Sequence, residues 1–553
     1  MSAQSKPFDI HIISSERIFP NNRSLTPSTV ALSIVDAAVA NYSPTGAIWF
    51  FDHVPGGHCD YSRHLRASLQ TVLDNYQQWT GELHWSNYEP DSNDHTKRFQ
   101  RLCLTWGTKS DPGTEFVTAS VSETLASIVP HWRYRSRSLK AWDHTNVRLD
   151  GLLPRATLAL RHLKITPNAP ALAVQVTTFS CQGIAIGIQM SHPLGDAMTL
   201  ATFVRDWTAI SKAMLATEPL PIMTRDFDPQ QIDRSAAGDI DGHAPDPDLM
   251  NISRNLPYLR YDHWSKPSQT SWPDLITADD LASHNAKYPY SPGTPVPWSQ
   301  WDLSCPCAAY ILHFSGDEIQ EIWEAAQGNS SSTSPTVSRH DALLAHLWQL
   351  INRSRLLRNP STPVHLLPSL GLRTRLSPPL PATFLGSPIL MTDITLPATA
   401  VCTSPLSTIA QTISSVQRQF TADTIPALLH DMIYADCPQR IWMGCLGTEY
   451  TMATSWVHLG VYEMDFGLGM GRPRYVEAVL IALDGLVQIM ELGDDDPHDQ
   501  QVTPEDNGVL IPEPKKTKNK KHWSHEGVDV SLALAKQAME RLLKDPLLRA
   551  YEK

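Results

Sequence analysis

The chain has 553 residues, 42% of them hydrophobic and 18% charged, with a formal net charge of −12. This length allows two lobes with sizeable cores, and the composition excludes a largely disordered chain. The acidic balance disfavours nucleic acid and anionic lipid as partners, and no stretch predicts a signal peptide or a membrane span, so we expect a cytoplasmic protein that acts on a small molecule.

The first part of the chain, residues 1–215, predicts a mixed α/β lobe. Apolar side chains recur at helical spacing in one segment, at Leu65, Leu69, Val72, Leu73 and Tyr76. Residues 172–190 are rich in β-branched side chains and are interrupted at Gln182 and Gly183, which predicts two neighbouring strands joined by a tight turn. An amphipathic helix follows, with an apolar stripe at Leu200, Phe203, Val204 and Trp207.

The rest of the chain predicts a crossover and a second α/β lobe. Residues 216–305 lack sustained periodicity and are rich in Pro, Asp and Ser, which indicates a long connection. The second lobe, 306–553, begins with a strand and a helix at 308–326, continues with a helix at 338–357 and closes with a helix at 530–548. Residues 493–522 carry an acidic run followed by a lysine run, which predicts a surface insertion.

The pattern HxxxD occurs three times, at His192/Asp196, His313/Asp317 and His525/Asp529. We interpret the second pair as strand and helix cap, and the third as part of a surface loop. His192 lies where a buried strand ends and a helix begins, with Pro193 suited to the first helical turn. A rigid junction is the support that a catalytic base requires. Spacing alone nevertheless slightly favours a histidine that is satisfied by backbone groups.

Other catalytic patterns are missing from the sequence. It contains no GxSxG, no HExxH, no GxxxxGK[ST] and no GxGxxG after a strand. Eight cysteines are spread thinly, and only Cys305 and Cys307 lie close together, without the further ligands of a zinc site. We therefore expect reduced thiols, no metal and no tightly bound cofactor.

A second signal lies far downstream, in TSWVHLGVYEMDFGLGMGRPRYV at residues 454–476. Together with SHPLGDA at 191–197, it resembles the two signatures of the BAHD acyltransferases, HxxxD in mid-chain and DFGWG toward the C-terminus. HPLGDA followed by FVRDW is closest to the fungal secondary-metabolite branch, which includes the trichothecene acetyltransferases. Two positions depart from the pattern. Ala197 stands where glycine is common, and Leu468 replaces the tryptophan of DFGWG.

The resemblance extends over most of the chain, through segments such as LSIVDAAV at 32–39 and LGLRTRLSPPLPATFLGSPI at 370–389. It implies an α/β fold of two lobes similar to chloramphenicol acetyltransferase, with a channel between them. Acyl-CoA would enter from one face and the acceptor from the other, and the strand around 455–466 would lie with the first lobe. One chain can build the whole channel, so we expect a monomer.

The resemblance also assigns residues to roles. Asp196 would pair with Arg373 and fix the geometry of the loop, whereas a serine-hydrolase triad with His192 is the less favoured alternative. It also places a tight structural turn at Asp465, Gly467 and Gly469. The acceptor side of the channel would lie at Thr454, Ser455 and Trp456, and a CoA site around Ser315. A buried strand residue is the alternative for Thr454 and Ser455.

A single histidine can support acyl transfer without an acyl-enzyme. Neutral near pH 7, His192 would accept the proton of an acceptor hydroxyl as that oxygen attacks the thioester of acyl-CoA. We expect an O-acyltransferase that transfers acetyl or another short acyl group to a natural product. Two alternatives stay open. One is transfer from a carrier protein, as in condensation domains, although Ser191 stands where those have a first histidine, and the other is a non-acylating binding or cyclisation protein of the same fold.

Overall fold

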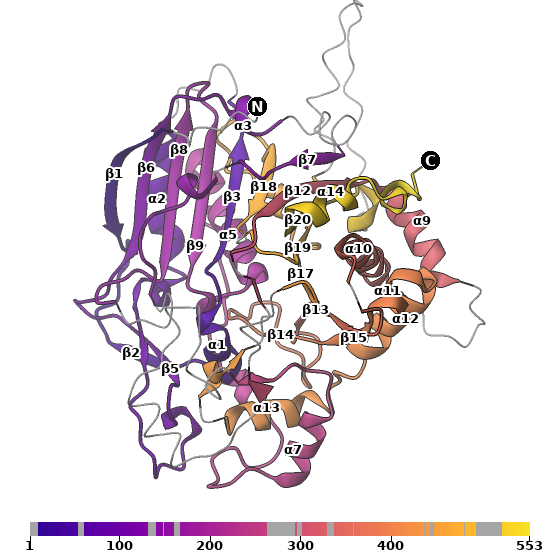
Figure 1. Cartoon of the computed structure of the whole chain (residues 1–553). Coiled ribbons are helices and arrows are strands. Elements are labelled where there is room, and N and C mark those ends of the chain that lie inside the picture. The colour runs from indigo at the N-terminus through magenta and orange to yellow at the C-terminus, as the bar shows by residue number, and fades with distance from the viewer. Residues whose placement is uncertain are drawn as a thin grey trace, which may run out of the picture.

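The computed structural model describes residues 9–53, 60–130, 140–147, 149–159, 166–262, 294–295, 301–302, 304–328, 337–357, 359–435, 437–442, 447–479, 482–493 and 522–552. Within these ranges the chain forms a six-stranded sheet, an eight-stranded sheet and two three-stranded sheets. The two large sheets lie side by side, with helices packed around them (Figure 1). The predicted α/β class is confirmed. The predicted insertion at 493–522 lies outside the described residues except for its two end residues.

The inner strands of the six-stranded sheet are buried on both faces, whereas its edge strand β1 is exposed. Its order is β1 (Ile10–Ile18), β6 (Thr114–Val121), β8 (Leu172–Phe179), β9 (Ile184–Met190), β3 (Thr45–Phe51) and β18 (Tyr475–Ala478). In β3, Trp49 and Phe51 lie in the core shared with helices α2 (Tyr61–Leu73) and α5 (Ala197–Ala216). Ile48 and Phe50 point the other way, into a core shared with β7 (Ala141–Asp143) and β12 (Cys307–Phe314) of the second sheet. This double burial explains the continuous apolar run of β9.

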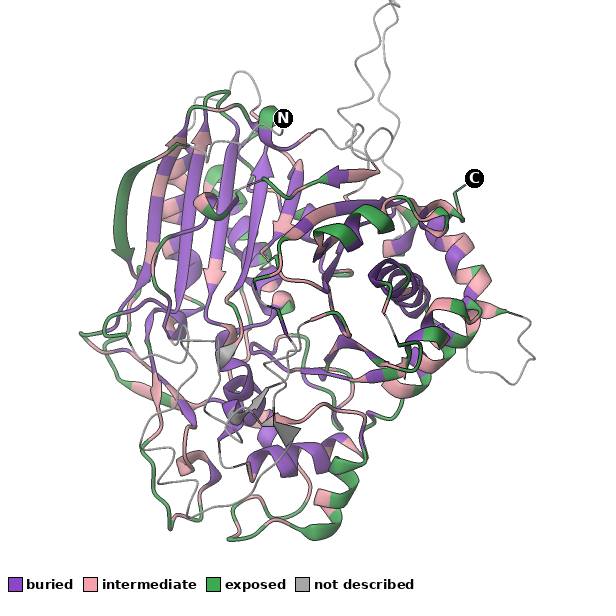
Figure 2. Ribbon diagram, viewed as in Figure 1, coloured by how far each residue is buried: buried purple, intermediate pink, exposed green. Residues whose placement is uncertain are grey.

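The eight-stranded sheet supports most of the second lobe. Its order is β14 (Ile389–Met391), β13 (Pro363–Gly371), β17 (Tyr450–Ser455), β19 (Leu486–Glu491), β20 (Val528–Ala535), β12 (Cys307–Phe314) and β7 (Ala141–Asp143), with β15 (Ile394–Pro397) beside β13. Helix α10 (Arg339–Arg355) is buried along nearly its whole length beneath its neighbours (Figure 2). Those neighbours are α9 (Gly316–Gln327), α11 (Ala398–Thr403), α12 (Leu406–Gln417) and α14 (Lys536–Leu542).

A smaller layer holds the elements nearest to the predicted site. Helix α1 (Ile34–Ala38) contacts the 3-10 turn η7 (His192–Leu194) and also α6 (Gln230–Asp233) and α13 (Ile425–Ile433). The remaining elements are α3 (Leu125–Ile128), α7 (Pro247–Arg254), the sheet of β2 (Ser28–Ala31), β5 (Leu102–Trp106) and β4 (Glu82–Trp85), and the sheet of β11 (Thr294–Pro295), β10 (Tyr261–Asp262) and β16 (Ile441–Trp442). Among the described residues, no helix combines the length and the apolar composition that a membrane span needs.

The two halves of the chain exchange strands between the large sheets. Strand β18 comes from the C-terminal half and pairs with β3, whereas β7 comes from the N-terminal half and pairs with β12. Strand β17 pairs with β13 and β19, so it lies in the second sheet. The segment that follows it lies with the first lobe, as expected for 455–466, because its apolar side chains from Trp456 to Met470 pack into the core of that lobe.

The structure confirms one local prediction and corrects two others. The hairpin at 172–190 is confirmed, since β8 and β9 pair antiparallel. The predicted closing helix is wrong in its first part, because residues up to Ala535 belong to β20 and the helix begins at Lys536. Pro193 lies in the 3-10 turn, and α5 begins only at Ala197 with Asp196 as its N-cap. The strand-to-helix junction is therefore a separate turn that holds His192.

Candidate active site

His192 begins the turn that joins β9 to α5. The residue before it, Ser191, is buried and its hydroxyl donates to the carbonyl of Ala159 at 2.7 Å. The residue that ends the turn region, Asp196, accepts the backbone N–H of Thr199 at 3.0 Å and so caps α5. Both ends of the turn are thus fixed by hydrogen bonds, which restricts where the imidazole can lie.

The ring of His192 contacts two residues that the sequence analysis did not single out. Its Nδ1 lies 2.9 Å from Oγ of Ser387, and its ring is perpendicular to that of Tyr42, with an interplanar angle of 89° and centroids 5.4 Å apart. Burial lowers the pKa of His192 to about 4, although the charge of Asp196 and a hydrogen bond to the backbone of His192 itself raise it. The imidazole is therefore neutral near pH 7, which is the form that can accept a proton.

The carboxylate of Asp196 is directed at Arg373. The guanidinium pairs with both carboxylate oxygens, with Nη2 3.0 Å from Oδ1. The same Nη2 lies 3.0 Å from Oγ1 of Thr199 and 3.3 Å from the carbonyl oxygen of Gly386. Among the described residues, no hydrogen bond joins Asp196 to His192, so the two do not form the geometry of a serine-hydrolase triad.

Residues 386 and 387 connect three segments that are distant in sequence. The carbonyl oxygen of Gly386 accepts the N–H of Asp196 at 3.2 Å and the hydroxyl of Thr199 at 2.7 Å. The N–H of Ser387 donates to Oδ1 of Asp36 at 2.8 Å. The site is therefore built from α1, the His192 turn and the segment 373–387, all within one chain.

The predicted structural turn in DFGLG lies at the far end of α5. Oδ1 of Asp465 accepts the N–H of Gly467 at 2.9 Å, and both Gly467 and Gly469 have positive φ angles of 74° and 78°. Asp465 also pairs with Lys212 at 2.8 Å. Since α5 rises 1.5 Å per residue, Lys212 is about 24 Å from Asp196 along the helix. This turn therefore cannot touch a substrate at His192, and Leu468, only 7% exposed, packs into the core.

The other predicted binding residues have different surroundings. The backbone N–H of Trp456 donates to the carbonyl oxygen of Ile489 at 2.8 Å. Thr454 and Ser455 lie in β17, which pairs with β19, so the three residues run alongside β19. The hydroxyl of Ser455 is buried and has no hydrogen-bond partner among the described residues. A buried hydroxyl without a partner is costly, by about 1 to 3 kcal/mol, which makes Ser455 a candidate for contact with a ligand or water.

Ser315 is the N-cap of α9. Its hydroxyl accepts the N–H of Glu318 at 3.2 Å and its own N–H donates to the Glu318 carboxylate at 2.8 Å, which is a complete capping box. The hydroxyl is already engaged, so Ser315 can contribute to a CoA site only through its position at the start of the helix. The predicted helix cap at Asp317 belongs to Ser315 instead, and His313 pairs with Asp529 at 3.1 Å.

A metal site is not supported by the strongest acidic cluster. Among the described residues, one group of His and Asp side chains lies close enough to hold an ion, at Asp94, His95 and Asp241. His95 already places Nδ1 2.8 Å from Asp241 and Nε2 3.3 Å from Asp233. The surrounding carboxylates raise the pKa of His95 against the opposing effect of its burial, which favours the protonated ring that a metal cannot use.

The chain matches one protein-family model and is similar to two curated fungal acyltransferases and to a solved structure. The model of the Transferase family matches residues 8–235 and 308–503. Acyltransferase AFT15-1 of Alternaria alternata is 27% identical over 470 residues, covering 83% of this chain and 85% of that protein. Acyltransferase abl6 of Leptosphaeria maculans is 26% identical over 545 residues, 98% of each chain. The solved structure of F. sporotrichioides TRI101 with coenzyme A and T-2 superposes with a TM-score of 0.60 at 17% identity, over 95% of this chain and 99% of that one.

Proposed function

This chain belongs to the Transferase family and is an acyltransferase, and on that premise we propose that it transfers a short acyl group from acyl-CoA to a hydroxyl of a small natural product. The resemblance to the BAHD acyltransferases and to their fungal secondary-metabolite members is thereby confirmed. One observation carries the proposal. His192 is a neutral imidazole in a turn fixed at both ends, at the place where three segments of the chain meet.

The reaction needs one base and no covalent enzyme intermediate. As the acceptor oxygen attacks the thioester carbonyl, its proton passes to Nε2 of His192 and a C–O bond forms. The tetrahedral intermediate then collapses, the C–S bond breaks, and the CoA thiolate takes the proton back from the imidazolium. Thiolate leaves readily because the pKa of a thiol is about 8.5. The products are the ester and free CoA, and no metal or redox cofactor takes part.

The co-substrate and the acceptor are proposed from relatives and from one side chain. Several solved TRI101 structures are complexes with coenzyme A or ethyl coenzyme A, and some of these also hold T-2 mycotoxin. We infer that this chain also takes acyl-CoA and a hydroxylated acceptor. The unpartnered hydroxyl of Ser455, with Thr454 and Trp456 beside it, would contact the acceptor or the oxyanion of the intermediate. Because the site residues come from one chain, a monomer would suffice.

Release of free thiol tests the donor directly. We expect purified protein, given acetyl-CoA and a pool of hydroxylated fungal metabolites, to release CoA and to produce an acceptor heavier by one acetyl group. Longer acyl-CoA donors in parallel assays would identify the preferred acyl group by product mass. Activity only with a carrier-bound thioester would replace the CoA proposal by the condensation-type reaction. Binding of acceptor without thiol release from any donor would favour a non-acylating protein.

The pH dependence of kcat/KM should reflect the low pKa of His192. The reaction needs the neutral ring, and protonation removes it as the pH falls through the pKa of about 4. We therefore expect kcat/KM to stay level from about pH 8 to about pH 5 and to fall only below that. Full recovery of activity after return to neutral pH would show that the loss is not unfolding. A fall centred near the ordinary histidine pKa of about 6.5 would contradict this assignment.

A further inference from the structure

We propose that Ser387, held in place by Asp36, is a positioning residue that fixes the His192 ring so that Nε2 is the nitrogen that takes the acceptor's proton. The inference deepens the function proposed above and rests on it. It assigns a role to two residues, Ser387 and Asp36, that lie outside the HxxxD and DFGLG motifs. Ser387 and Asp36 are both fully buried, with no exposed side-chain area.

The two contacts of the ring determine which nitrogen carries the proton. Oγ of Ser387 lies 2.9 Å from Nδ1 of His192. A hydrogen bond to the backbone of His192 itself raises the pKa of the ring, so the backbone partner is an acceptor, the carbonyl oxygen. Within one residue only Nδ1 comes near that oxygen, and a carbonyl cannot donate. Nδ1 therefore carries the hydrogen, which the carbonyl oxygen of His192 and Oγ of Ser387 share as acceptors, and Nε2 keeps its lone pair for the acceptor substrate.

Ser387 is held from both sides. Its N–H donates to Oδ1 of Asp36 at 2.8 Å, and the preceding carbonyl, that of Gly386, accepts the hydroxyl of Thr199 at 2.7 Å. These bonds join the serine to α1 on one side and to α5 on the other. Rotation of the backbone at 386–387 would break at least one of them, so the backbone from which Oγ of Ser387 reaches Nδ1 has a fixed place relative to the ring.

Asp36 is fixed by a capping box at the start of α1. Its Oδ2 accepts the hydroxyl of Ser33 at 2.6 Å and the N–H of Ser33 at 3.2 Å. Burial raises the pKa of Asp36 to about 7, against the lowering effect of the hydrogen bonds from Ser33 and Ser387. A proton on Oδ2 leaves Oδ1 free to accept from Ser387, so the contact that positions the serine exists in both protonation states.

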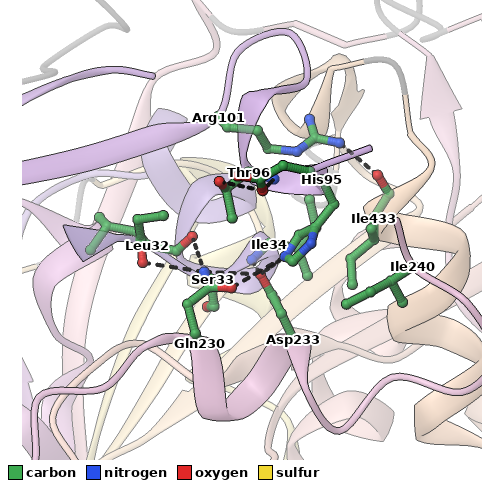
Figure 3. Close-up of polar contacts among 12 residues, drawn as sticks. Leu32, Ser33, Ile34, His95, Thr96, Arg101, Gln230, Asp233, Ile240 and Ile433 are labelled. Carbon is green, nitrogen blue, oxygen red and sulfur yellow. Dashed lines mark hydrogen bonds and ion pairs between the residues drawn. The ribbon is translucent and has the colours of Figure 1, made fainter. Parts of the chain in front are cut away.

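Side chains of the crossover in turn hold the start of α1 (Figure 3). Oδ1 of Asp233 accepts the N–H of Ile34 at 2.9 Å, and Gln230 donates to the carbonyl of Leu32 at 3.2 Å. His95 approaches Asp233 from the other side, with Nε2 3.3 Å from Oδ2. The crossover thus supports the position of Asp36, and through Asp36 and Ser387 that of the catalytic ring.

The partner of Nδ1 of His192 is a neutral serine hydroxyl and not a carboxylate, and this difference affects the pKa of the base. A carboxylate at Nδ1 stabilises the protonated ring, as in serine hydrolases, and raises the pKa of the base. A serine hydroxyl orients the ring with little such stabilisation. The carboxylate of Asp196 is directed at Arg373 and not at the ring, so the base stays neutral over a wide pH range.

A pair of substitutions tests the positioning role. We expect Ser387→Ala to lower kcat about tenfold, the rate equivalent of one neutral hydrogen bond, and to leave the KM values for acyl-CoA and acceptor unchanged. Asp36→Ala should lower kcat to a similar extent, and Asp36→Asn, which keeps an oxygen for Ser387, should recover most of that loss. Because Asp36 acts through Ser387, the double variant Asp36→Ala/Ser387→Ala should be no slower than the slower single variant.

A buried serine remote from the site provides the matched control. Ser354, 2% exposed, donates its hydroxyl only to the carbonyl of Ile351 within α10, and Ser354→Ala should keep the wild-type kcat. Wild-type kcat in Ser387→Ala, or losses of the two single variants that multiply in the double variant, would overturn the positioning role and leave the proposed function intact. Activity that survives replacement of His192 would instead overturn the proposed function.

Discussion

His192→Gln is expected to lower kcat about 10²- to 10⁴-fold, the usual contribution of a general acid–base residue. Glutamine keeps a polar side chain of similar length in the turn, but its amide cannot accept a proton near neutral pH. The proposed role of His192 is to take the proton of the acceptor and not to hold CoA, so the Kd for CoA should change little. Single-turnover release of CoA gives the chemical step, and calorimetric titration with CoA gives the Kd.

His64→Gln is the matched control for this prediction. His64 lies on α2, and its Nε2 is 2.9 Å from Oγ of Ser211, so it also combines a partly buried imidazole with a serine hydroxyl. Ser211 is close to Lys212, near the end of α5 remote from Asp196. His64→Gln should therefore retain wild-type turnover. Equal turnover in wild type and His192→Gln would show that His192 is not the base.

The elements that could be predicted from sequence are those whose signal is local. The β-branched residues of 172–190 and the break at Gln182 and Gly183 predict the β8–β9 hairpin, and the end of that apolar run predicts the junction at His192. The prediction of a helix over β20 is wrong because its small alanines between larger apolar residues fit the helical pattern that continues into α14. Burial between β19 and β12 decides its conformation, and no local pattern encodes that pairing.

The contacts that complete the site could not be predicted, because they join residues far apart in the chain. Ser387 is 195 residues from His192 and 351 residues from Asp36. Ser387 and Asp36 lie in segments that resemble the family but outside HxxxD and DFGLG, and a serine in a proline-rich segment is ordinary by composition. A partial signal existed in LSIVDAAV, where Ser33 followed three residues later by Asp36 fits an N-terminal capping box. That signal predicts a helix start and does not predict the second partner of the carboxylate.

Arg373→Ala is expected to lower the free energy of unfolding by about 3 to 5 kcal/mol, because it leaves the carboxylate of Asp196 buried without its cation. Asp196 is 5% exposed, and the side chain of Arg373 is 14% exposed. Chemical denaturation followed by tryptophan fluorescence gives the free energy. The exposed pair of Arg234 and Asp228 is the control, since Arg234→Ala should cost less than about 1 kcal/mol.

The double variant Asp196→Ala/Arg373→Ala separates the ion pair from its neighbours. If the cost of Arg373→Ala is the uncompensated charge of Asp196, removal of that charge should restore part of the stability, and the two losses should not add. Activity should remain low in the double variant, because Arg373 also binds the carbonyl of Gly386, which precedes the serine that contacts His192. Additive losses of stability, or a stable Arg373→Ala protein with full activity, would show that the pair does not hold the two halves of the site together.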